Sequence, residues 1–472
     1  MRAHASPLLA SYGDALADPA ARSELRGWCA LAILSLAVAG VFALLLALSR
    51  TPGIQAWVPW PAAFFGKGLV VHVVFAFIVW FLAVLGAFLT LAAWRVAGGR
   101  PPLAGAGRAG PVLAAIACVL LFVPALLDRG EPTLNNYVPA IIDPLYYAGL
   151  GVLALGLMLP VARLLAAPVA RLGLPPDDLS VAALGAAVVF CLALVCFGLA
   201  YGNLAGQTPS FAFNEELFWG GGHLLQFIST ILMVGAWSTL ARLTLAGEVF
   251  PARLVKGAIV FLILCALPAP VFYFVFPPFA AEQTLAFSGL LWALGPPTVV
   301  VAAAGVLVLG RRGKPAALPW RNPVFLSLVL SVGVFALGGV LGMFIDGADT
   351  RTPAHYHAVI AGVTLSFMGL FLGLFLPLLG RAPRPGRRLN VLVIAFAAGQ
   401  TLACIGLFIA GGHGAPRKVA GAAQGLIDVG AIVGMSLNGV GALIAVTGGL
   451  LFIWVAGRAL FGRVPPVDRT SA

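Results

Sequence analysis

The sequence has little charge. Only 9% of its 472 residues are Asp, Glu, Lys or Arg, whereas 61% are hydrophobic. An ordinary soluble domain carries roughly 25% charged residues, so this chain is too poor in charge to cover itself with a water-facing surface. A soluble globular protein is therefore excluded, and an integral membrane protein is predicted.

Cysteine is also scarce, and its spacing indicates no metal site or disulfide framework. There is no CxxC motif and no Cys/His cluster with metal-site spacing. All six cysteines lie in apolar stretches, where we interpret them as small packing residues: Cys29, Cys118, Cys191, Cys196, Cys265 and Cys404.

Apolar runs long enough to span a bilayer recur along the whole chain. A hydrocarbon core of about 30 Å needs roughly 20 apolar residues per helix. The sequence therefore predicts an all-α fold: a twelve-helix transmembrane bundle, forming a single transmembrane domain over residues 1–472 with about 27–457 embedded and short tails at both ends. The predicted spans are residues 27–48, 67–93, 110–127, 144–162, 180–201, 216–240, 253–276, 286–309, 322–345, 354–379, 390–410 and 429–457.

Positive charge is distributed unevenly between the two sets of loops. Cytoplasmic loops of membrane proteins are enriched in Lys and Arg, and placing both termini in the cytoplasm gives that distribution. We therefore expect a multi-pass protein of a bacterial inner membrane, whose net charge of +12 favours anionic lipid rather than nucleic acid. The outer loops then hold only these cations: Arg50, Lys67, Arg129, Arg351, Arg417 and Lys418.

Four of the six histidines, His72, His223, His355 and His357, lie near the starts of the second, sixth and tenth predicted spans. The other two, His4 and His413, lie in polar segments. An ionisable group inside a membrane is costly and usually functional. At a rise of 1.5 Å per residue, the four side chains are expected within about one helical turn in the outer third of the bilayer, as a layer of metal or haem ligands requires.

The HxH pair in the tenth span also predicts the directions in which its two histidine side chains point. Residues two apart on a helix point about 200° apart, so His355 and His357 cannot bind the same iron. They can bind two centres on opposite sides of the span, and neutral imidazole is the usual axial ligand of haem.

These histidines and the segments around them resemble the catalytic subunit of the haem–copper oxidase superfamily, which includes cytochrome c oxidase subunit I and the large subunit of nitric oxide reductases. The segments are "GKGLVVHVVF", "FWGGGHLLQF" and "TPAHYHAVIAG", supported by "NNYVP", "LGPPT" and "GGHGAPRKVAG". The resemblance covers nearly the whole chain, because that subunit is also a twelve-helix bundle with both termini cytoplasmic.

The resemblance implies a role for each matching residue. His72 and His357 would ligate a low-spin haem that transfers electrons, and His355 would be the proximal ligand of a second, high-spin haem that binds O2 or NO. His223 falls where the family has its first copper ligand. Arg417 and Lys418 match a basic pair near the haem propionates, a role for which cations above the haem layer are suited.

The sequence departs from the family at the copper site. Ala269 and Pro270 stand where the family has two adjacent histidines, and a single imidazole at His223 does not hold copper, so copper is doubtful. Phe227 stands where the oxidases have a redox-active tyrosine. The acids nearest the site, Glu215 and Glu216, suit either a helix N-terminal cap or a proton role.

Three functions remain open from the sequence. The first is a divergent oxidoreductase of the terminal oxidase or nitric oxide reductase type, with two haems, in which His223 and Gln226 line the distal pocket and an electron donor, such as a cytochrome c or subunit II-like protein, binds the outer face. The second is a non-catalytic electron relay, gas sensor or assembly partner. The third is a transporter or channel, for which Pro268, Pro270, Pro296 and Pro297 would break helices.

Overall fold

The computed structural model describes residues 7–54, 57, 64–167, 177–311, 318–345, 347 and 349–462. His4 and the end of the predicted C-terminal tail lie outside these residues.

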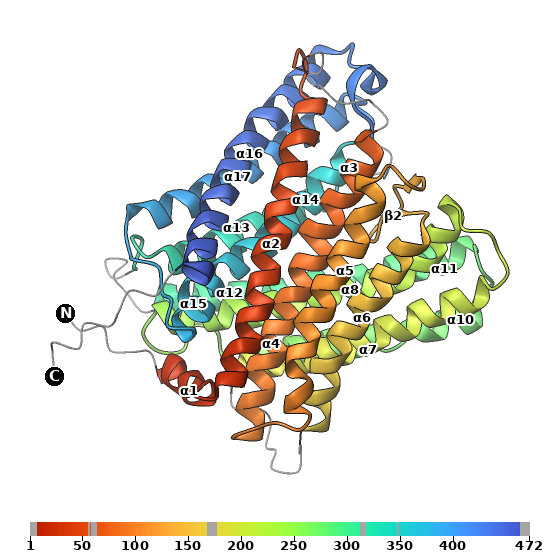
Figure 1. Ribbon diagram of the computed structural model, residues 1–472. Coiled ribbons are helices and arrows are strands. Elements are labelled where there is room, and N and C mark those ends of the chain that lie inside the picture. Colours follow the sequence, from red (N-terminus) through yellow and green to blue (C-terminus); the bar gives the residue numbers. More distant parts are fainter. Residues whose placement is uncertain are drawn as a thin grey trace.

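Twelve helices in the described part are long and apolar enough to cross a membrane, which confirms the predicted all-α bundle (Figure 1). Several of these spans are built from two labelled helices. In chain order the elements are α1 (Pro7–Ala15), α2 (Pro19–Arg50), α3 (Phe64–Val73), α4 (Trp80–Ala97), α5 (Ala109–Leu126), β1 (Pro132–Thr133), β2 (Ala140–Ile141), α6 (Pro144–Ala166), α7 (Asp178–Asn203), α8 (Phe211–Thr244), α9 (Ala252–Ala266), α10 (Phe272–Val275), α11 (Ala281–Leu290), α12 (Gly295–Arg311), α13 (Pro323–Gly342), α14 (Arg351–Leu370), α15 (Leu376–Leu378), α16 (Arg387–Gly412) and α17 (Val429–Phe461).

Two features at the start of the chain differ from the prediction. A short helix, α1, precedes the first span, and that span begins at Pro19 rather than near residue 27. The Asp18 side chain accepts a hydrogen bond from the backbone N–H of Ala20, at 2.7 Å, and Pro19 occupies the first helical position. Both residues favour helix initiation, so the helix extends into the polar segment that the hydropathy pattern left out.

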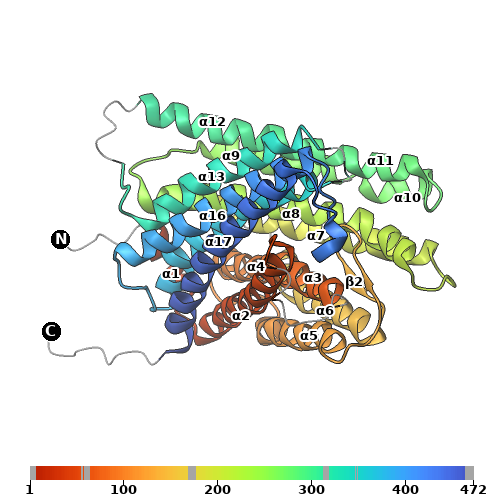
Figure 2. The same cartoon turned by 90° about the horizontal axis from the view of Figure 1, so that it is seen from above.

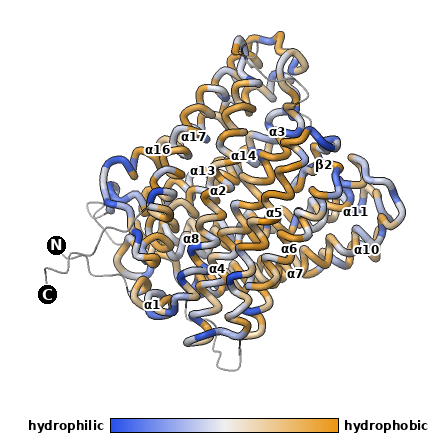
Figure 3. Tube along the Cα trace, viewed as in Figure 1, coloured by the Kyte–Doolittle hydropathy of each residue, from blue (hydrophilic) through white to orange (hydrophobic). Residues whose placement is uncertain are grey.

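The histidine-bearing spans are the central ones. The second, sixth and tenth spans have 78%, 94% and 83% of their most apolar segments buried. Seen from above, α5 and α6 lie on one side of the molecule and α9 and α12 on the other, with α8 between them (Figure 2). Hydrophobic residues dominate the helices, and hydrophilic ones gather toward the loops (Figure 3). The four span histidines are therefore placed among protein side chains rather than on the outer rim.

Glycine brings the last two spans into close contact. A Cβ on Gly406 would lie 2.6 Å from the carbonyl oxygen of Gly434, and one on Gly441 would lie 2.8 Å from that of Gly399. Small residues at such positions let two helix backbones approach in lipid, where dispersion contacts replace the hydrophobic effect as the source of stability. The α16–α17 pair is accordingly a closely packed wall behind α14.

A buried ion pair connects the first and fourth spans near the α1 end of the bundle. Glu24 and Arg163 are 2% and 1% exposed, and one guanidinium nitrogen of Arg163 lies 2.6 Å from Glu24 Oε2. A second guanidinium nitrogen bonds to Oε1, which also accepts a hydrogen bond from the Thr90 hydroxyl at 2.8 Å. The two-fold contact compensates both charges inside the apolar bundle.

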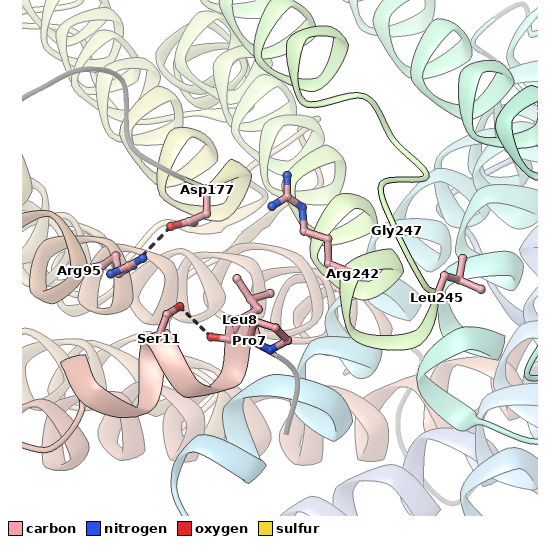
Figure 4. Close-up of a pocket in the computed structure, with 8 residues that line it drawn as sticks. All are labelled: Pro7, Leu8, Ser11, Arg95, Asp177, Arg242, Leu245 and Gly247. Atoms are coloured by element: carbon pink, nitrogen blue, oxygen red, sulfur yellow. Dashed lines mark hydrogen bonds and ion pairs between the residues drawn. The ribbon is translucent and has the colours of Figure 1, made fainter. Parts of the chain in front are cut away.

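A surface cavity of about 360 Å³ lies at the same end, beside α1 (Figure 4). Arg95 points toward Asp177, with 3.9 Å between Nε and Oδ2, and the Tyr12 hydroxyl donates to Asp177 at 2.6 Å. Burial, with a smaller effect of Asp177, raises the pKa of Tyr12 well above its usual value. The cavity is at the end of the bundle opposite the histidines. It lies where α1 packs against the bundle and is not part of the candidate site.

We predict that the stability of the folded protein depends on Glu24 and Arg163 being present together. Replacing one partner, as in Glu24→Gln or Arg163→Met, leaves the other group without its counterpart and should cost about 3–5 kcal/mol of stability. The double variant should recover much of that loss, because no buried charge remains. Thermal unfolding of the purified protein in detergent measures the effect, with the exposed Arg100→Met as control. Single variants as stable as the control would contradict the prediction.

Candidate functional site

His72 and His357 lie on the second and tenth spans, close enough for an electrostatic interaction. The Nδ1 atom of His72 lies 3.0 Å from the carbonyl oxygen of Ala39 on α2. A carbonyl only accepts, so Nδ1 carries the proton and Nε2 keeps its lone pair. His357 stacks against Tyr356, with ring centres 5.1 Å apart, and lies close enough to His72 for an electrostatic interaction. Two imidazoles from separate helices are thus neighbours in the bundle.

Both of these spans contain a π-helical segment. Val74–Val79 begins two residues after His72, and Phe371–Phe375 follows α14 in the tenth span. Trp80 and Phe371, at the ends of the two segments, stack with centres 5.5 Å apart. Such π-helical turns are rare and occur often at functional sites, because the wider turn redirects the side chains on either side. The backbone therefore departs from a regular helix next to His72, whereas the segment in the tenth span begins fourteen residues after His357.

His355 leaves the same span in another direction, toward α13. Its Nδ1 lies 2.7 Å from the carbonyl oxygen of Gly338 and therefore carries the proton. Gly342 permits this approach, since a Cβ there would lie 2.6 Å from the same nitrogen. The two histidines of the HxH motif are thus held on different sides of span ten, one against α13 and the other toward α3.

His223 has a protein partner at each ring nitrogen. Its Nδ1 lies 2.6 Å from the Trp219 carbonyl oxygen and its Nε2 lies 3.1 Å from the Tyr137 hydroxyl. The side chain is fully buried, between the rings of Tyr137 and Phe287, whose centres are 4.3 and 5.9 Å away. Because Nδ1 donates to a carbonyl, Nε2 accepts from the phenol. Gln226, one turn further along α8, is half-buried.

Three consecutive glycines explain how aromatic rings surround His223. A Cβ at Gly222 would lie 2.5 Å from the Cβ of Tyr137, and one at Gly220 would lie 2.5 Å from the Phe287 ring. A Cβ at Gly221 would meet Phe197 of α7 equally closely. The GGGH segment is therefore a packing device that lets rings approach α8 beside its histidine.

The loop that carries Tyr137 is clamped by charged groups. The backbone N–H and the side-chain amide of Asn136 donate to the two carboxylate oxygens of Glu215, at 2.9 and 2.8 Å. The Lys418 amine donates to the Leu134 carbonyl and to Asn136 Oδ1. Burial, followed by the neighbouring Arg417, lowers the pKa of Lys418 to about 8. The structure thus places Lys418 on the loop, and Glu215 caps the loop rather than a helix.

Arg50 is a candidate that the sequence analysis missed. Its Nε and Nη2 atoms are buried and have no hydrogen-bond partner within the described residues. Arg50 and Arg417 both interact electrostatically with Tyr356, the residue between the two histidines of span ten. Arg50 ends a long apolar run and looks like an ordinary loop cation, so only its three-dimensional neighbours reveal it.

The histidines of the second and tenth spans fit haem. An imidazole with Nδ1 anchored on a carbonyl and Nε2 available is the usual arrangement of a metal-binding histidine, and His72 and His355 both have it. The two buried Arg50 nitrogens that have no partner among the described residues favour an anion, and the carboxylate groups of haem would supply one. Arg50 therefore fits a propionate better than it fits an apolar protein interior.

The residues present do not fit copper. Within the part of the chain that the structure describes, no three His, Cys, Asp or Glu side chains group so that they could hold a metal ion. Ala269 is fully buried in a 3-10 turn of the seventh span and Pro270 follows it. Both nitrogens of His223 have other partners, so the three-nitrogen set that copper needs is not assembled.

The match to a protein family covers most of the chain. Residues 25–444 match the family model described as Cytochrome C and Quinol oxidase polypeptide I. An uncharacterised protein of Aquifex aeolicus is 32% identical over 346 residues, covering 73% of this chain and 82% of that protein. The cytochrome c oxidase subunit 1 of Thermus thermophilus is 25% identical over 285 residues, covering 56% of this chain and 50% of that protein.

The same architecture occurs in solved structures. A haem-copper terminal oxidase dimer contains a chain that superposes with a TM-score of 0.79, covering 95% of this chain and 85% of its own, at 15% sequence identity. At that identity the likeness shows the fold alone.

We predict a pH-dependent contribution of Lys418 to stability. Its ordinary pKa of 10.5 falls to about 8 in the folded protein, so the unfolded chain binds the extra proton between these values. Stability contributed by Lys418 should therefore rise with pH through this window and be lost as the pH falls toward 8. Unfolding midpoints of the wild type and of Lys418→Met, measured across the window, should diverge accordingly.

A Tyr137→Phe background supplies the control, because burial also raises the pKa of this nearby phenol. The Lys418-dependent slope should persist in that background. Parallel curves for the protein with and without Lys418 would refute the assignment.

Proposed function

This chain belongs to the family of cytochrome c and quinol oxidase polypeptide I, and on that premise we propose that it is a respiratory oxidoreductase with two haem sites. His72 and His357 would hold a low-spin haem that receives electrons, and His355 would hold a high-spin haem that binds O2 or NO. Bound there, the haems would supply one-electron redox chemistry and an open iron coordination position.

The observation that carries the proposal is the geometry of His72. Its Nδ1 is fixed on the Ala39 carbonyl, its Nε2 has no protein partner among the described residues, and His357 lies close by. The hydrogen bond fixes both tautomer and ring orientation, and it strengthens Nε2 as a ligand. His357 from span ten would be the second histidine ligand of the same haem, and its imidazole stacks against the Tyr356 ring.

His355 supports a second site of different character. The Gly338 carbonyl orients its ring from the α13 side, and no second histidine is needed for a five-coordinate haem. His223 and Tyr137 would then act on the distal side as a fixed, hydrogen-bonded pair, with Gln226 as a further amide donor. This arrangement requires no copper.

Arg50 and Arg417 would neutralise the propionates. Both lie by Tyr356, whereas Lys418 is engaged with the loop at Leu134 and Asn136. Of the basic pair that the sequence suggests, Arg417 is the better candidate, and Arg50 takes the other position. Negative propionates would in turn compensate the buried Arg50 charge.

One observation favours a second candidate, a non-catalytic relay or gas sensor. His223 already has two partners, and Ala269 and Pro270 stand where the resemblance puts the other two copper ligands. Such a protein would keep both haem sites and lack turnover. In either case we propose a multi-pass protein of a bacterial inner membrane with both termini cytoplasmic, and a separate electron donor at the end where His72 lies.

Spectra of histidine variants test the haem assignments. His72→Ala and His357→Ala should each remove the low-spin signal from the reduced-minus-oxidised spectrum of the purified protein. His355→Ala should keep that signal but abolish the carbon monoxide difference spectrum, because only its haem has an open position. His413→Ala is the matched control, since this histidine pairs with Asp428 at the surface, at 2.8 Å. A colourless wild type after expression with ample haem supply would overturn the proposal.

Metal analysis and turnover distinguish the two candidates. Copper should be well below one atom per chain while iron reaches two, because the described residues provide no copper ligand set. Consumption of O2 or NO with an artificial donor would establish the oxidoreductase, and haem that is reduced without turnover would establish the relay. Stoichiometric copper would show that ligands rearrange around His223.

A further inference from the structure

Three buried polar atoms near the His223 pocket have no hydrogen-bond partner in the described structure. They are Oε1 of Glu216, the hydroxyl of Tyr273 and the amide nitrogen of Gln283. The three side chains are only 8%, 6% and 2% exposed. A buried polar group without a partner is destabilising, so three of them in one region need an explanation.

The three groups come from different helices but lie at the same level. Phe287 of α11 packs against Gly220 of α8, where a Cβ would meet its ring. Gln283 lies one turn before Phe287, and Glu216 lies one turn before Gly220. The Trp219 indole donates to the Thr284 carbonyl at 3.3 Å. This contact aligns α11 with α8, so we infer that Gln283 and Glu216 lie at a similar level on the two helices.

Tyr273 reaches the same place from α10. A Cβ at Gly220 would meet the Tyr273 hydroxyl, and the phenol ring packs on Phe287 with centres 5.4 Å apart. Cys196 and Glu216 interact electrostatically with this phenol, whose hydroxyl also lies against the Gly220 backbone. Gln283 and Phe287 are the buried residues of α11, and Tyr273 is the buried residue of α10. Both short helices thus direct a polar side chain at α8.

The solvent lies one loop away. The other Glu216 oxygen, Oε2, accepts from the backbone N–H of Phe279 at 3.3 Å, in the segment between α10 and α11. The Phe279 side chain is 50% exposed, and its φ of +65° is unusual for a non-glycine residue. Glu216 is therefore bonded on one side to a surface loop and faces the buried phenol and amide on the other.

We propose that Glu216, Tyr273 and Gln283 form a buried water site in which the Glu216 carboxyl exchanges protons with the adjacent surface. Water can accept from the amide and the phenol and donate to the carboxyl, so it satisfies all three groups at once, as buried waters usually do. A cation is not favoured, because the Gln283 atom is a donor.

The role of the site rests on the proposed function. Reduction of O2 or NO consumes protons, and Glu216 lies about two helical turns before His223 on α8. In the exchange the water would accept from the Glu216 carboxyl in place of the Tyr273 phenol. It would pass a proton on toward the site that consumes protons, and the resulting carboxylate would take a proton again from solvent across the Phe279 loop. Neighbouring Glu215 is held by Asn136 and does not face this site.

A high-resolution density map of the full-length protein tests the site without any turnover. Density for at least one water within hydrogen-bond distance of Glu216, Tyr273 and Gln283 is expected. Direct hydrogen bonds among the three side chains, with no water density, would overturn the proposal.

Infrared spectroscopy tests the exchanging proton. A protonated-carboxyl band that shifts in D2O should be absent in Glu216→Gln and present in the neighbouring control Glu215→Gln. Tyr273→Phe and Gln283→Leu, which remove one partner each, should shift the band without removing it. A wild-type spectrum identical to that of Glu216→Gln, or a band insensitive to both partner variants, would refute it.

Haem spectra separate this inference from the proposed function. Glu216→Gln is expected to bind haem normally and to consume O2 or NO more slowly, which would support the proton role. An unchanged rate of O2 or NO consumption would refute that role. If the wild type binds no haem, the proposed function fails while the water and infrared results still decide the site.

Discussion

The site depends on one interaction that occurs twice: an imidazole Nδ1–H donated to a main-chain carbonyl of a neighbouring helix. Ala39 on α2 provides the carbonyl for His72, and Gly338 on α13 provides it for His355. In a lipid-embedded bundle no water is available to orient these rings, so the protein must supply the partner. The roles proposed for His72 and His355 follow from it, because each bond selects the tautomer whose Nε2 keeps its lone pair for a metal.

Glycine makes this arrangement sterically possible. Gly342 leaves room for the His355 ring, and Gly220 and Gly222 leave room for Phe287 and Tyr137 beside His223. The same device brings α16 and α17 into backbone contact behind α14. A bundle of this kind gains stability from close packing rather than from solvent exclusion, so the places where a side chain is missing determine where the rings and, by inference, the cofactors fit.

The sequence predicted those features that depend on hydropathy and helical period. The twelve spans follow from the lengths of the apolar runs. The different directions of His355 and His357 follow from the rotation of about 100° per residue along a helix. It could not predict Arg50 as a buried group, because a cation after an apolar run has the same pattern in a loop. The π-helical turn at Val74–Val79 and the Tyr137–His223 bond are equally invisible, since both depend on packing between segments distant in sequence.

The divergence at the copper position extends beyond two substituted residues. Restoring histidines at positions 269 and 270 would place them in a 3-10 turn whose neighbour Tyr273 packs against Gly220. His223 would still have Nδ1 on the Trp219 carbonyl and Nε2 on the Tyr137 phenol, and Tyr137 is held in turn through Asn136 and Glu215. A metal would have to displace that chain of hydrogen bonds before it gained a first ligand. Phe287 of α11 packs both on His223 and on Tyr273, so the aromatic enclosure of His223 and the proposed Glu216–Tyr273–Gln283 site share one ring.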